Sequence, residues 1–160
     1  MDYVSALQLI IPSRVDSGSV RVFELDTGVC LHIWEHDDAV TAIVAWENMV
    51  FSSSNDRTIR EWSNDKEAMV SVYQGAMAAI NCLCLVHEIG GKAGRLLVGG
   101  CADGAVVCWQ HGASDKDYIV SHRFHQASVN HMRTTHFTAV GDADSADVVA
   151  LVSADAAGQV

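Results

Sequence analysis

The segment Asn48–Ser63 (NMVFSSSNDRTIREWS) combines two short strand patterns with a tight turn between them. An apolar run passes into serines, and Asn55-Asp56-Arg57 then interrupts it with residue types that favour turns. From Thr58 to Trp62 the side chains alternate, as they do on a strand whose residues point to opposite faces. The segment therefore predicts a β-hairpin.

The second strand of this hairpin recurs along the chain. Ser19–Phe23, Thr58–Trp62 and Ala105–Trp109 each place an aromatic residue three positions after a β-branched one, and a fourth copy begins at Gly158. The equivalent β-branched residues lie 39, 47 and 54 residues apart. Regular strands separated by turn residues, without helical periodicity, predict an all-β repeat protein.

The order of Ser52, Asp56 and Trp62 within the hairpin resembles the end of a WD-repeat, the unit of one class of β-propeller. That family usually closes the unit with Trp-Asp, whereas this chain has Trp62-Ser63. The resemblance implies a WD-repeat β-propeller fragment, an open arc of four-stranded antiparallel blades with strands a to d from the axis outward. It covers residues 7–160.

The resemblance divides the chain into four blades. The first is incomplete (7–34), the second (39–74) and third (79–124) are whole, and the fourth is incomplete (128–160). Leu7–Ser13 fits strand b of the first blade, which leaves that blade without a strand a. The extra residues, His87–Arg95 and Thr134–Asp147, fall at a–b connections, which the resemblance puts on the bottom face. We therefore expect part of a longer propeller, a truncated product, or a chain that needs a partner.

An open arc leaves one blade face uncovered at each end, and repeat arrays normally protect such faces with polar caps. Apolar residues instead crowd both ends: Leu7, Leu9, Ile10 and Ile11 at one, and Val148, Val149, Leu151 and Val152 at the other. We expect the isolated chain to self-associate, aggregate or depend on a partner chain.

The resemblance also implies a structural tetrad of buried polar side chains in the second blade: His36, Ser52, Asp56 and Trp62. The other blades keep only part of the set. Asp103 and Trp109 remain in the third, where Ala76 and Gly99 replace His and Ser; His125 and Ser153 remain in the fourth, where Ala157 replaces Asp and Asp155 is close by; Ser13, Ser17 and Phe23 stand in the first.

Ser52, His36 and Asp56 are also the residue types of a catalytic triad, which makes a hydrolase the alternative function. A triad needs an exposed nucleophile and an oxyanion hole. Ser52 lacks the G-x-S-x-G context of a nucleophile elbow. The scaffold interpretation is therefore preferred, with Ser52→Ala as the test.

Three other groupings fit metal or phosphate sites poorly. The histidines His122, His125, His131 and His136 and the pair Cys82-x-Cys84 lack compact zinc spacing. Asp142, Asp144 and Asp147 lack the glycine and glutamate of a calcium loop, and Gly90-Gly91-Lys92 lacks the following Ser or Thr of a phosphate loop. We expect no metal and no cofactor.

Composition narrows the function classes. The formal net charge of −10 disfavours a nucleic-acid-binding module, and no apolar stretch approaches a membrane span or a signal peptide. Five cysteines without framework spacing favour a reducing, intracellular compartment, cytoplasmic or nuclear. The predicted function is a non-catalytic scaffold for protein partners. By resemblance, binding would use the top face formed by the d–a and b–c turns, with the candidates Asp37, Asp38, Arg57, Met77 and Gln126.

Overall fold

A computed structural model describes residues 8–12, 18–89, 92–113, 120–137 and 148–157. Within these ranges the chain forms thirteen β-strands and no helix. The strands are β1 (Gln8–Pro12), β2 (Ser19–Glu24), β3 (Cys30–Glu35), β4 (Val40–Trp46), β5 (Met49–Ser54), β6 (Ile59–Ser63), β7 (Ala68–Tyr73), β8 (Ile80–Ile89), β9 (Lys92–Cys101), β10 (Ala105–Gln110), β11 (Val120–Arg123), β12 (Val129–Phe137) and β13 (Val148–Asp155).

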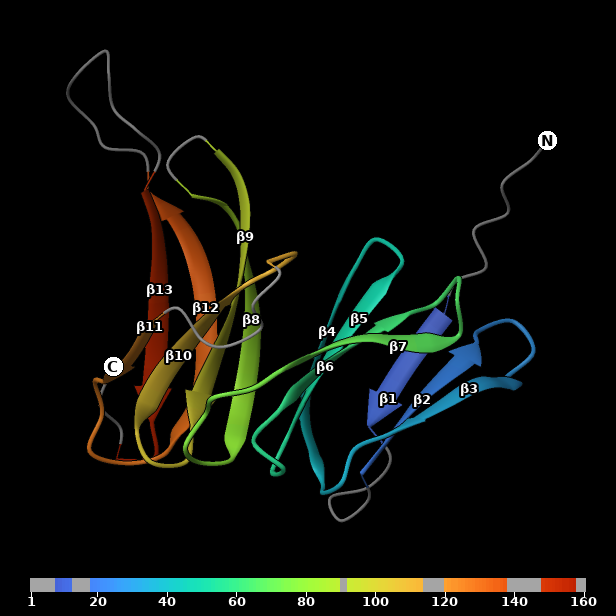
Figure 1. Cartoon of the computed structure of the whole chain (residues 1–160), viewed down its shortest axis with the longest axis horizontal. Coiled ribbons are helices and arrows are strands. Elements are labelled where there is room, and N and C mark those ends of the chain that lie inside the picture. The colour runs from blue at the N-terminus through green and yellow to red at the C-terminus, as the bar shows by residue number, and fades with distance from the viewer. Residues whose placement is uncertain (1–7, 13–17, 90–91, 114–119, 138–147, 158–160) are drawn as a thin grey trace.

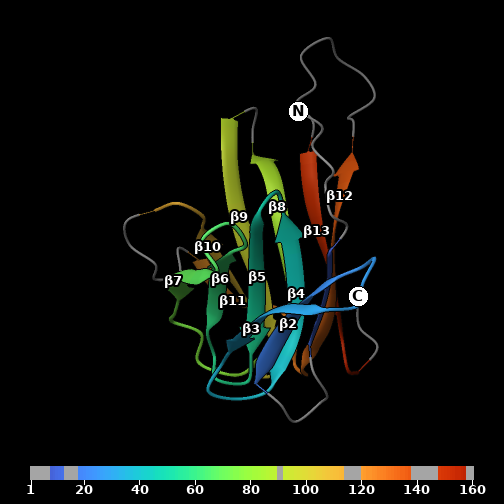
Figure 2. The same ribbon diagram turned by 90° about the vertical axis from the view of Figure 1, so that its right-hand side faces the viewer.

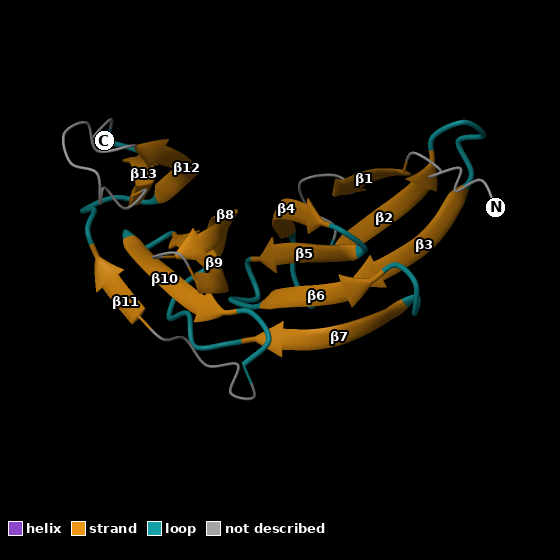
Figure 3. Ribbon diagram, turned by 90° about the horizontal axis from the view of Figure 1, so that it is seen from above, coloured by secondary structure: helices purple, strands orange, loops and turns teal. Residues whose placement is uncertain are grey.

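The strands form four separate antiparallel sheets, which we call blades 1 to 4. Blade 1 has the order β1-β2-β3, blade 2 β4-β5-β6-β7, blade 3 β8-β9-β10-β11, and blade 4 the pair β12-β13. The sheets follow one another along an arc (Figure 1), with β4, β8 and β12 on its concave side and β3, β7 and β11 on its convex side (Figure 3). The described strands do not close into a ring. The predicted all-β, open propeller-like arc is confirmed.

The repeated hairpin ends occupy equivalent places in the sheets. In blade 2, β5 pairs with β6 so that Val50 lies opposite Trp62 and Ser52 opposite Arg60. Alternate residues of β6 then contact different neighbours: Trp62 packs in a cluster with blade 1, and Ile59 packs in a cluster with blade 3. Because alternate residues of β6 point to opposite faces, this one strand packs against both neighbouring blades.

The extra residues at the a–b connections differ from the prediction. They were expected to lie between strands a and b, but 87–89, 92–95 and 134–137 extend those strands, and the others lie outside the described residues. The ladder of β8 and β9 continues through His87↔Arg95 and Ile89↔Lys92, and β12 continues to Phe137. The long hairpins of blades 3 and 4 stand side by side beyond the end of the shorter β4–β5 hairpin (Figure 2).

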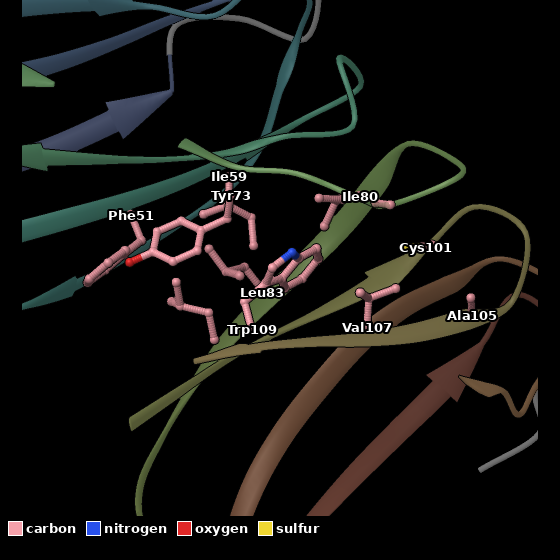
Figure 4. Close-up of a cluster of buried hydrophobic side chains, with 11 residues drawn as sticks. Phe51, Ile59, Tyr73, Ile80, Leu83, Cys101, Ala105, Val107 and Trp109 are labelled. Atoms are coloured by element: carbon pink, nitrogen blue, oxygen red, sulfur yellow. The ribbon is translucent and has the colours of Figure 1, made fainter. Parts of the chain in front are cut away.

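The largest buried core lies between blades 2 and 3 (Figure 4). Blade 2 contributes Phe51, Ile59 and Tyr73, and blade 3 contributes Trp109 at its centre. All four side chains have no exposed surface. Smaller clusters fill the junctions on either side, and in one of them the rings of Trp34 and Trp62 stack with centroids 5.3 Å apart. Large aromatic side chains are buried at the junctions of blade 2 with blades 1 and 3, whereas aliphatic, methionine and cysteine side chains fill the junction between blades 3 and 4.

A β-bulge interrupts strand a of each of blades 2, 3 and 4 at the same place. The extra residue is polar in all three cases: Thr41, Asn81 and Asn130. Thr41 Oγ1 donates to the carbonyl oxygen of Ile80, and Asn81 Nδ2 donates to Ser128 Oγ. The bulges of blades 2 and 3 therefore direct polar side chains along the arc, where they bond blade 2 to blade 3 and blade 3 to the start of blade 4.

The two end faces of the arc differ in chemistry. On blade 4, Val129 and Met132 pack against blade 3, while His131 and Arg133 are exposed beside Val152. On blade 1, Leu31 and Ile33 of β3 are exposed. Of the apolar residues expected at the blade 4 end, only Val152 has a described side chain, and it is exposed. Leu7 and the side chains of 8–12 and 148–151 lie outside the described set, and self-association stays a prediction.

Candidate functional site

The structure brings His36, Ser52, Asp56 and Trp62 into one continuous hydrogen-bond chain in blade 2. Trp62 Nε1 donates to Ser52 Oγ at 2.7 Å, Ser52 Oγ lies 2.7 Å from His36 Nε2, and His36 Nδ1 lies 2.9 Å from Asp56 Oδ2. An indole can only donate and a carboxylate can only accept, so the two ends fix the direction of the whole chain. The Ser52 hydroxyl then donates to Nε2, and a neutral His36 carries its proton on Nδ1.

Asp56 forms the end of this chain and also caps the b–c turn. Its Oδ1 accepts hydrogen bonds from the backbone N–H and the hydroxyl of Thr58, at 2.9 and 2.6 Å. Burial alone would raise the pKa of the Asp56 carboxyl, but the hydrogen bonds from His36 and Thr58 outweigh burial and hold that pKa well below its usual range. The carboxylate is therefore charged at neutral pH and anchors both the d–a and the b–c turn.

The distances among Ser52, His36 and Asp56 match those of a catalytic triad, but the surroundings do not. Ser52 has no exposed surface, and its oxygen accepts the Trp62 indole N–H. A nucleophile must reach a substrate carbonyl next to an oxyanion hole. A buried hydroxyl with both its partners inside the blade does not meet that requirement.

Blade 3 satisfies its tryptophan in a different way. Trp109 Nε1 donates to the backbone carbonyl oxygen of Gln74 at 2.6 Å, across the junction with blade 2. A Cβ added at Gly99, the serine position, would lie 3.1 Å from the Trp109 ring and 2.9 Å from the Ile80 side chain. Asp103 still caps its own turn by accepting the Ala105 N–H at 3.1 Å. Asp103 therefore still stabilises its turn, although Ala76 stands where a histidine would bind its carboxylate.

Blade 4 keeps a shortened version of the chain. His125 Nε2 lies 2.7 Å from Ser153 Oγ, and His125 Nδ1 lies 3.4 Å from Asp155 Oδ2. Asp155 Oδ1 accepts the Ala157 N–H at 3.0 Å, as Ser54 Oγ accepts the Asp56 N–H in blade 2. Asp155 therefore takes two roles that blade 2 divides between Ser54 and Asp56: it caps the turn and it faces the histidine. Ala157, at the position of Asp56, does neither. Ser13 and Ser17 of blade 1 lie outside the described residues.

The structure also reveals a polar network that sequence reasoning missed. Glu61, which is 4% exposed, accepts a hydrogen bond from the Tyr73 hydroxyl at 2.7 Å and contacts His111 Nε2 at 3.0 Å. The His111 ring packs edge-on against Phe51, and Arg95 lies over the Trp46 ring, 3.4 Å from its centroid. Burial and the Glu61 carboxylate raise the pKa of Tyr73, so its hydroxyl remains a donor. This network closes the bottom end of the junction between blades 2 and 3.

The five top-face candidates are all exposed at the end of the arc where the d–a and b–c turns meet, the lower end in Figure 1. Backbone hydrogen bonds join these turns: His36 N–H donates to Gly18, and His125 N–H donates to Gly104. Asp37 also bonds Arg60 Nη2 at 2.6 Å. The candidates Asp37, Asp38, Arg57, Met77 and Gln126 thus belong to one end of the arc but are spread over three blade junctions.

The remaining groupings are the candidate metal and phosphate sites. Among the described residues, no set of three or more His, Cys, Asp or Glu side chains is placed to hold a metal ion. Asp142, Asp144, Asp147, Gly90 and Gly91 lie outside those residues. In the same ranges no helix is long and apolar enough to cross a membrane.

The sheets and their junctions define the class of this protein as a propeller-type repeat protein, and comparison with known structures agrees. The chain is similar in fold to the computationally designed Ika8 protein, with a TM-score of 0.61 and 21% sequence identity. That likeness covers 89% of this chain and 44% of the Ika8 chain. At this identity it supports the fold alone.

The sequence comparison finds a similarity to a WD-repeat protein. A stretch of 68 residues, 42% of this chain, is 31% identical to the WD repeat-containing protein pop2 of Schizosaccharomyces pombe, of which it covers 10%. No family model matches the chain. The pop2 match and the four-stranded antiparallel sheets together fit part of a WD-repeat β-propeller.

Proposed function

We propose that this chain is a non-catalytic, intracellular scaffold that binds protein partners through the top face of its blades. The likeness to a WD repeat-containing protein and the propeller-like fold point in general to protein interaction rather than catalysis. The top-face location and the individual residues are our own addition.

One observation carries the proposal: the polar groups of the tetrad are buried and bonded to one another, whereas the turns they anchor present exposed side chains. Asp56 holds the backbone N–H of Asp37 at 3.2 Å and that of Thr58 at 2.9 Å. The turns are therefore held by buried hydrogen bonds, while Asp37, Asp38 and Arg57 on their outer surface are exposed. Exposed loops on a rigid sheet framework are a common place for binding.

The test uses a partner captured with the wild-type chain from cell extract, identified by mass spectrometry and then purified. Its affinity is measured against single variants at the five top-face positions (Asp37→Ala, Asp38→Ala, Arg57→Glu, Met77→Ala, Gln126→Ala). We expect at least one variant to weaken binding by about tenfold, as at a typical hot spot. Lys66→Ala, in a turn at the opposite end of blade 2, is the control. Unchanged affinity in all five variants would discard the top-face proposal.

A further inference from the structure

We propose that the free edge of β13 binds an extended segment of a partner protein, and that a tryptophan in this segment donates its indole N–H to Ser153 Oγ. The site is a sheet edge in blade 4 rather than the top-face turns. The inference therefore goes beyond the proposed function and does not depend on it.

Among the described residues, blade 4 ends in an open sheet edge at one end of the arc (Figure 3). β13 pairs only with β12, whereas its equivalents β5 and β9 are bonded to a neighbouring strand on both sides. The equivalence follows from the register, in which Met132 lies opposite Ser153 as Ile43 lies opposite Ser52. An open edge presents a row of backbone N–H and C=O groups, and an extended segment satisfies them by adding a strand.

The polar chain of blade 4 is assembled up to the position of the indole donor. His125 Nε2 lies 2.7 Å from Ser153 Oγ, and His36 Nε2 lies at the same distance from Ser52 Oγ. In blade 2 the Trp62 indole donates to the serine oxygen, and Ser52 has no exposed surface. Ser153 is partly exposed, and within the described ranges only His125 bonds its hydroxyl. The Ser153 oxygen is therefore open to a further donor.

The register of the other blades defines where that donor would lie. The tryptophan of strand c is opposite the residue two positions before the serine site, as Trp62 is opposite Val50 and Trp109 is opposite Leu97. The corresponding residue of β13 is Leu151. An antiparallel segment in the same register places its tryptophan opposite Leu151 and brings the indole to Ser153.

An aromatic side chain on strand d of blade 3 is placed to receive the indole ring. At the junction of blades 1 and 2, Trp34 pairs with Val20 and stacks on Trp62 with ring centroids 5.3 Å apart. In blade 3, His122 pairs with Val106 at the matching register position, and its side chain is exposed. His122 therefore offers a stacking surface at the place where Trp34 provides one.

The chemistry of the site selects the occupant. The Ser153 hydroxyl donates to His125, so its oxygen needs a donor, and an indole N–H can only donate. All four tryptophans of the sequence lie in strands of blades 1 to 3: Trp34, Trp46, Trp62 and Trp109. A second copy of the chain would have to pull one of these strands out of its own sheet. The occupant is therefore a different protein with tryptophan among strand-forming residues.

The experiment measures the binding of synthetic peptides to the 160-residue chain by isothermal titration calorimetry. The reference peptide has the sequence of residues 57–64 (RTIREWSN), which includes strand c of blade 2. In the second peptide, 3-benzothienylalanine replaces the tryptophan, because it keeps the shape of the ring and lacks the N–H. We expect the tryptophan peptide to bind about fivefold more tightly, the effect of one neutral hydrogen bond.

Two variants separate the hydrogen bond from the stacking contact. Ser153→Ala removes the acceptor, so the two peptides should bind this variant equally. Ser71→Ala, on the outer strand of blade 2, is the matched control and should keep the fivefold ratio. His122→Ala should weaken both peptides by the same factor, and His122→Phe should restore them. Because His122 is exposed, these substitutions should leave the fold intact.

Several outcomes would overturn the inference: no binding of the tryptophan peptide up to about 1 mM, equal binding of both peptides by the wild-type chain, or an unchanged ratio in Ser153→Ala. A dimer of the chain that excludes the peptide would indicate that a second copy covers the edge, and it would overturn the inference as well. Arg57→Glu should leave peptide binding unchanged. The top-face proposal is therefore tested separately, by the captured partner.

Discussion

Blades 2 and 3 each place a buried tryptophan at the equivalent point of a hairpin, but the two indole N–H groups bind different kinds of acceptor. Trp62 donates to a side chain, at the start of a hydrogen-bond chain that joins two strands of its blade to the d–a and b–c turns. Trp109 donates to the Gln74 backbone carbonyl at the junction with the neighbouring blade. A buried donor requires a partner, but the partner need not come from the same motif.

The difference changes what each tryptophan stabilises. In blade 2 the polar chain ties the top-face turns to the sheet, and the apolar packing lies on either side of it. In blade 3 Gly99 and Ala76 leave room for Trp109 to enter the largest core. We therefore infer that Trp62 supports the geometry of turns within a blade, whereas Trp109 supports the contact between two blades.

The largest expected effect comes from removing the interblade tryptophan. Trp109→Ala should lower the free energy of unfolding by about 3–5 kcal/mol, because it empties a fully buried ring site. Urea denaturation measures the change. Trp109→Phe is the control, and it should cost less because it retains most of the apolar contact. A loss below about 1 kcal/mol for the alanine variant would contradict the central position of Trp109.

Breaking the polar chain of blade 2 should have a smaller effect. His36→Ala leaves the Ser52 hydroxyl and the Asp56 carboxylate each without one buried partner, so we expect a loss of about 1–3 kcal/mol. Thermal unfolding of a variant that still folds provides the measurement. An unchanged unfolding curve would show that the four side chains do not act as a stabilising tetrad.

Inserting the missing hydroxyl into blade 3 should not rebuild a tetrad. Gly99→Ser should cost about 1–3 kcal/mol, because its Cβ would crowd the Trp109 ring and the Ile80 side chain. Gly99→Ala separates this crowding from any new hydrogen bond. If the serine variant unfolds at a higher temperature than wild type, the two blades are interchangeable and the contrast between them is wrong.

Acidification should weaken blade 2 through Asp56. Its pKa is depressed in the folded state, so the unfolded chain binds the proton more readily. The stabilisation is present above the ordinary carboxyl value of 3.8 and is lost as the pH falls below it. Melting temperatures measured between about pH 7 and pH 3 should fall less steeply for Asp56→Asn than for wild type. Parallel profiles would show that Asp56 does not titrate as inferred.

The smallest perturbation is chemical labelling of the cysteines, which leaves the fold intact and compares the reaction rates of their thiols. Burial raises the pKa of Cys82 to about 11 and the pKa of Cys84 and Cys101 to about 12, while Cys30 is exposed. A thiol-reactive dye should therefore label Cys30 first, and Cys30→Ser should remove the fast phase. Fast labelling of Cys82 or Cys84 under native conditions would indicate that the junction between blades 3 and 4 opens readily.

Local patterns in the sequence were sufficient to predict the hairpin ends, the blade order and the residues that meet in blade 2. Each of these three features depends on residues close in sequence or on a repeated pattern along the chain. Contacts without a motif were not predictable: His111 meets Glu61 from 50 residues away, and Trp109 binds a backbone oxygen that any residue could supply.

The segment His87–Arg95 was also difficult to predict. It contains Gly90, Gly91 and Gly94, which suggest a loop, yet 87–89 and 92–95 pair as strands. Ladder hydrogen bonds with the partner strand outweigh the weak strand preference of glycine, and that gain depends on the partner rather than on local sequence.

The buried carboxylate of Glu61 has a consequence for the order of the blades. Its oxygens accept one hydrogen bond from Tyr73 of its own blade and meet His111 of blade 3. A neighbour without a polar group at that point would leave a charge partly unsatisfied in a dry junction, which is costly. Glu61 therefore makes the pairing of blade 2 with blade 3 specific. It disfavours an apolar sheet that would otherwise fit the same surface.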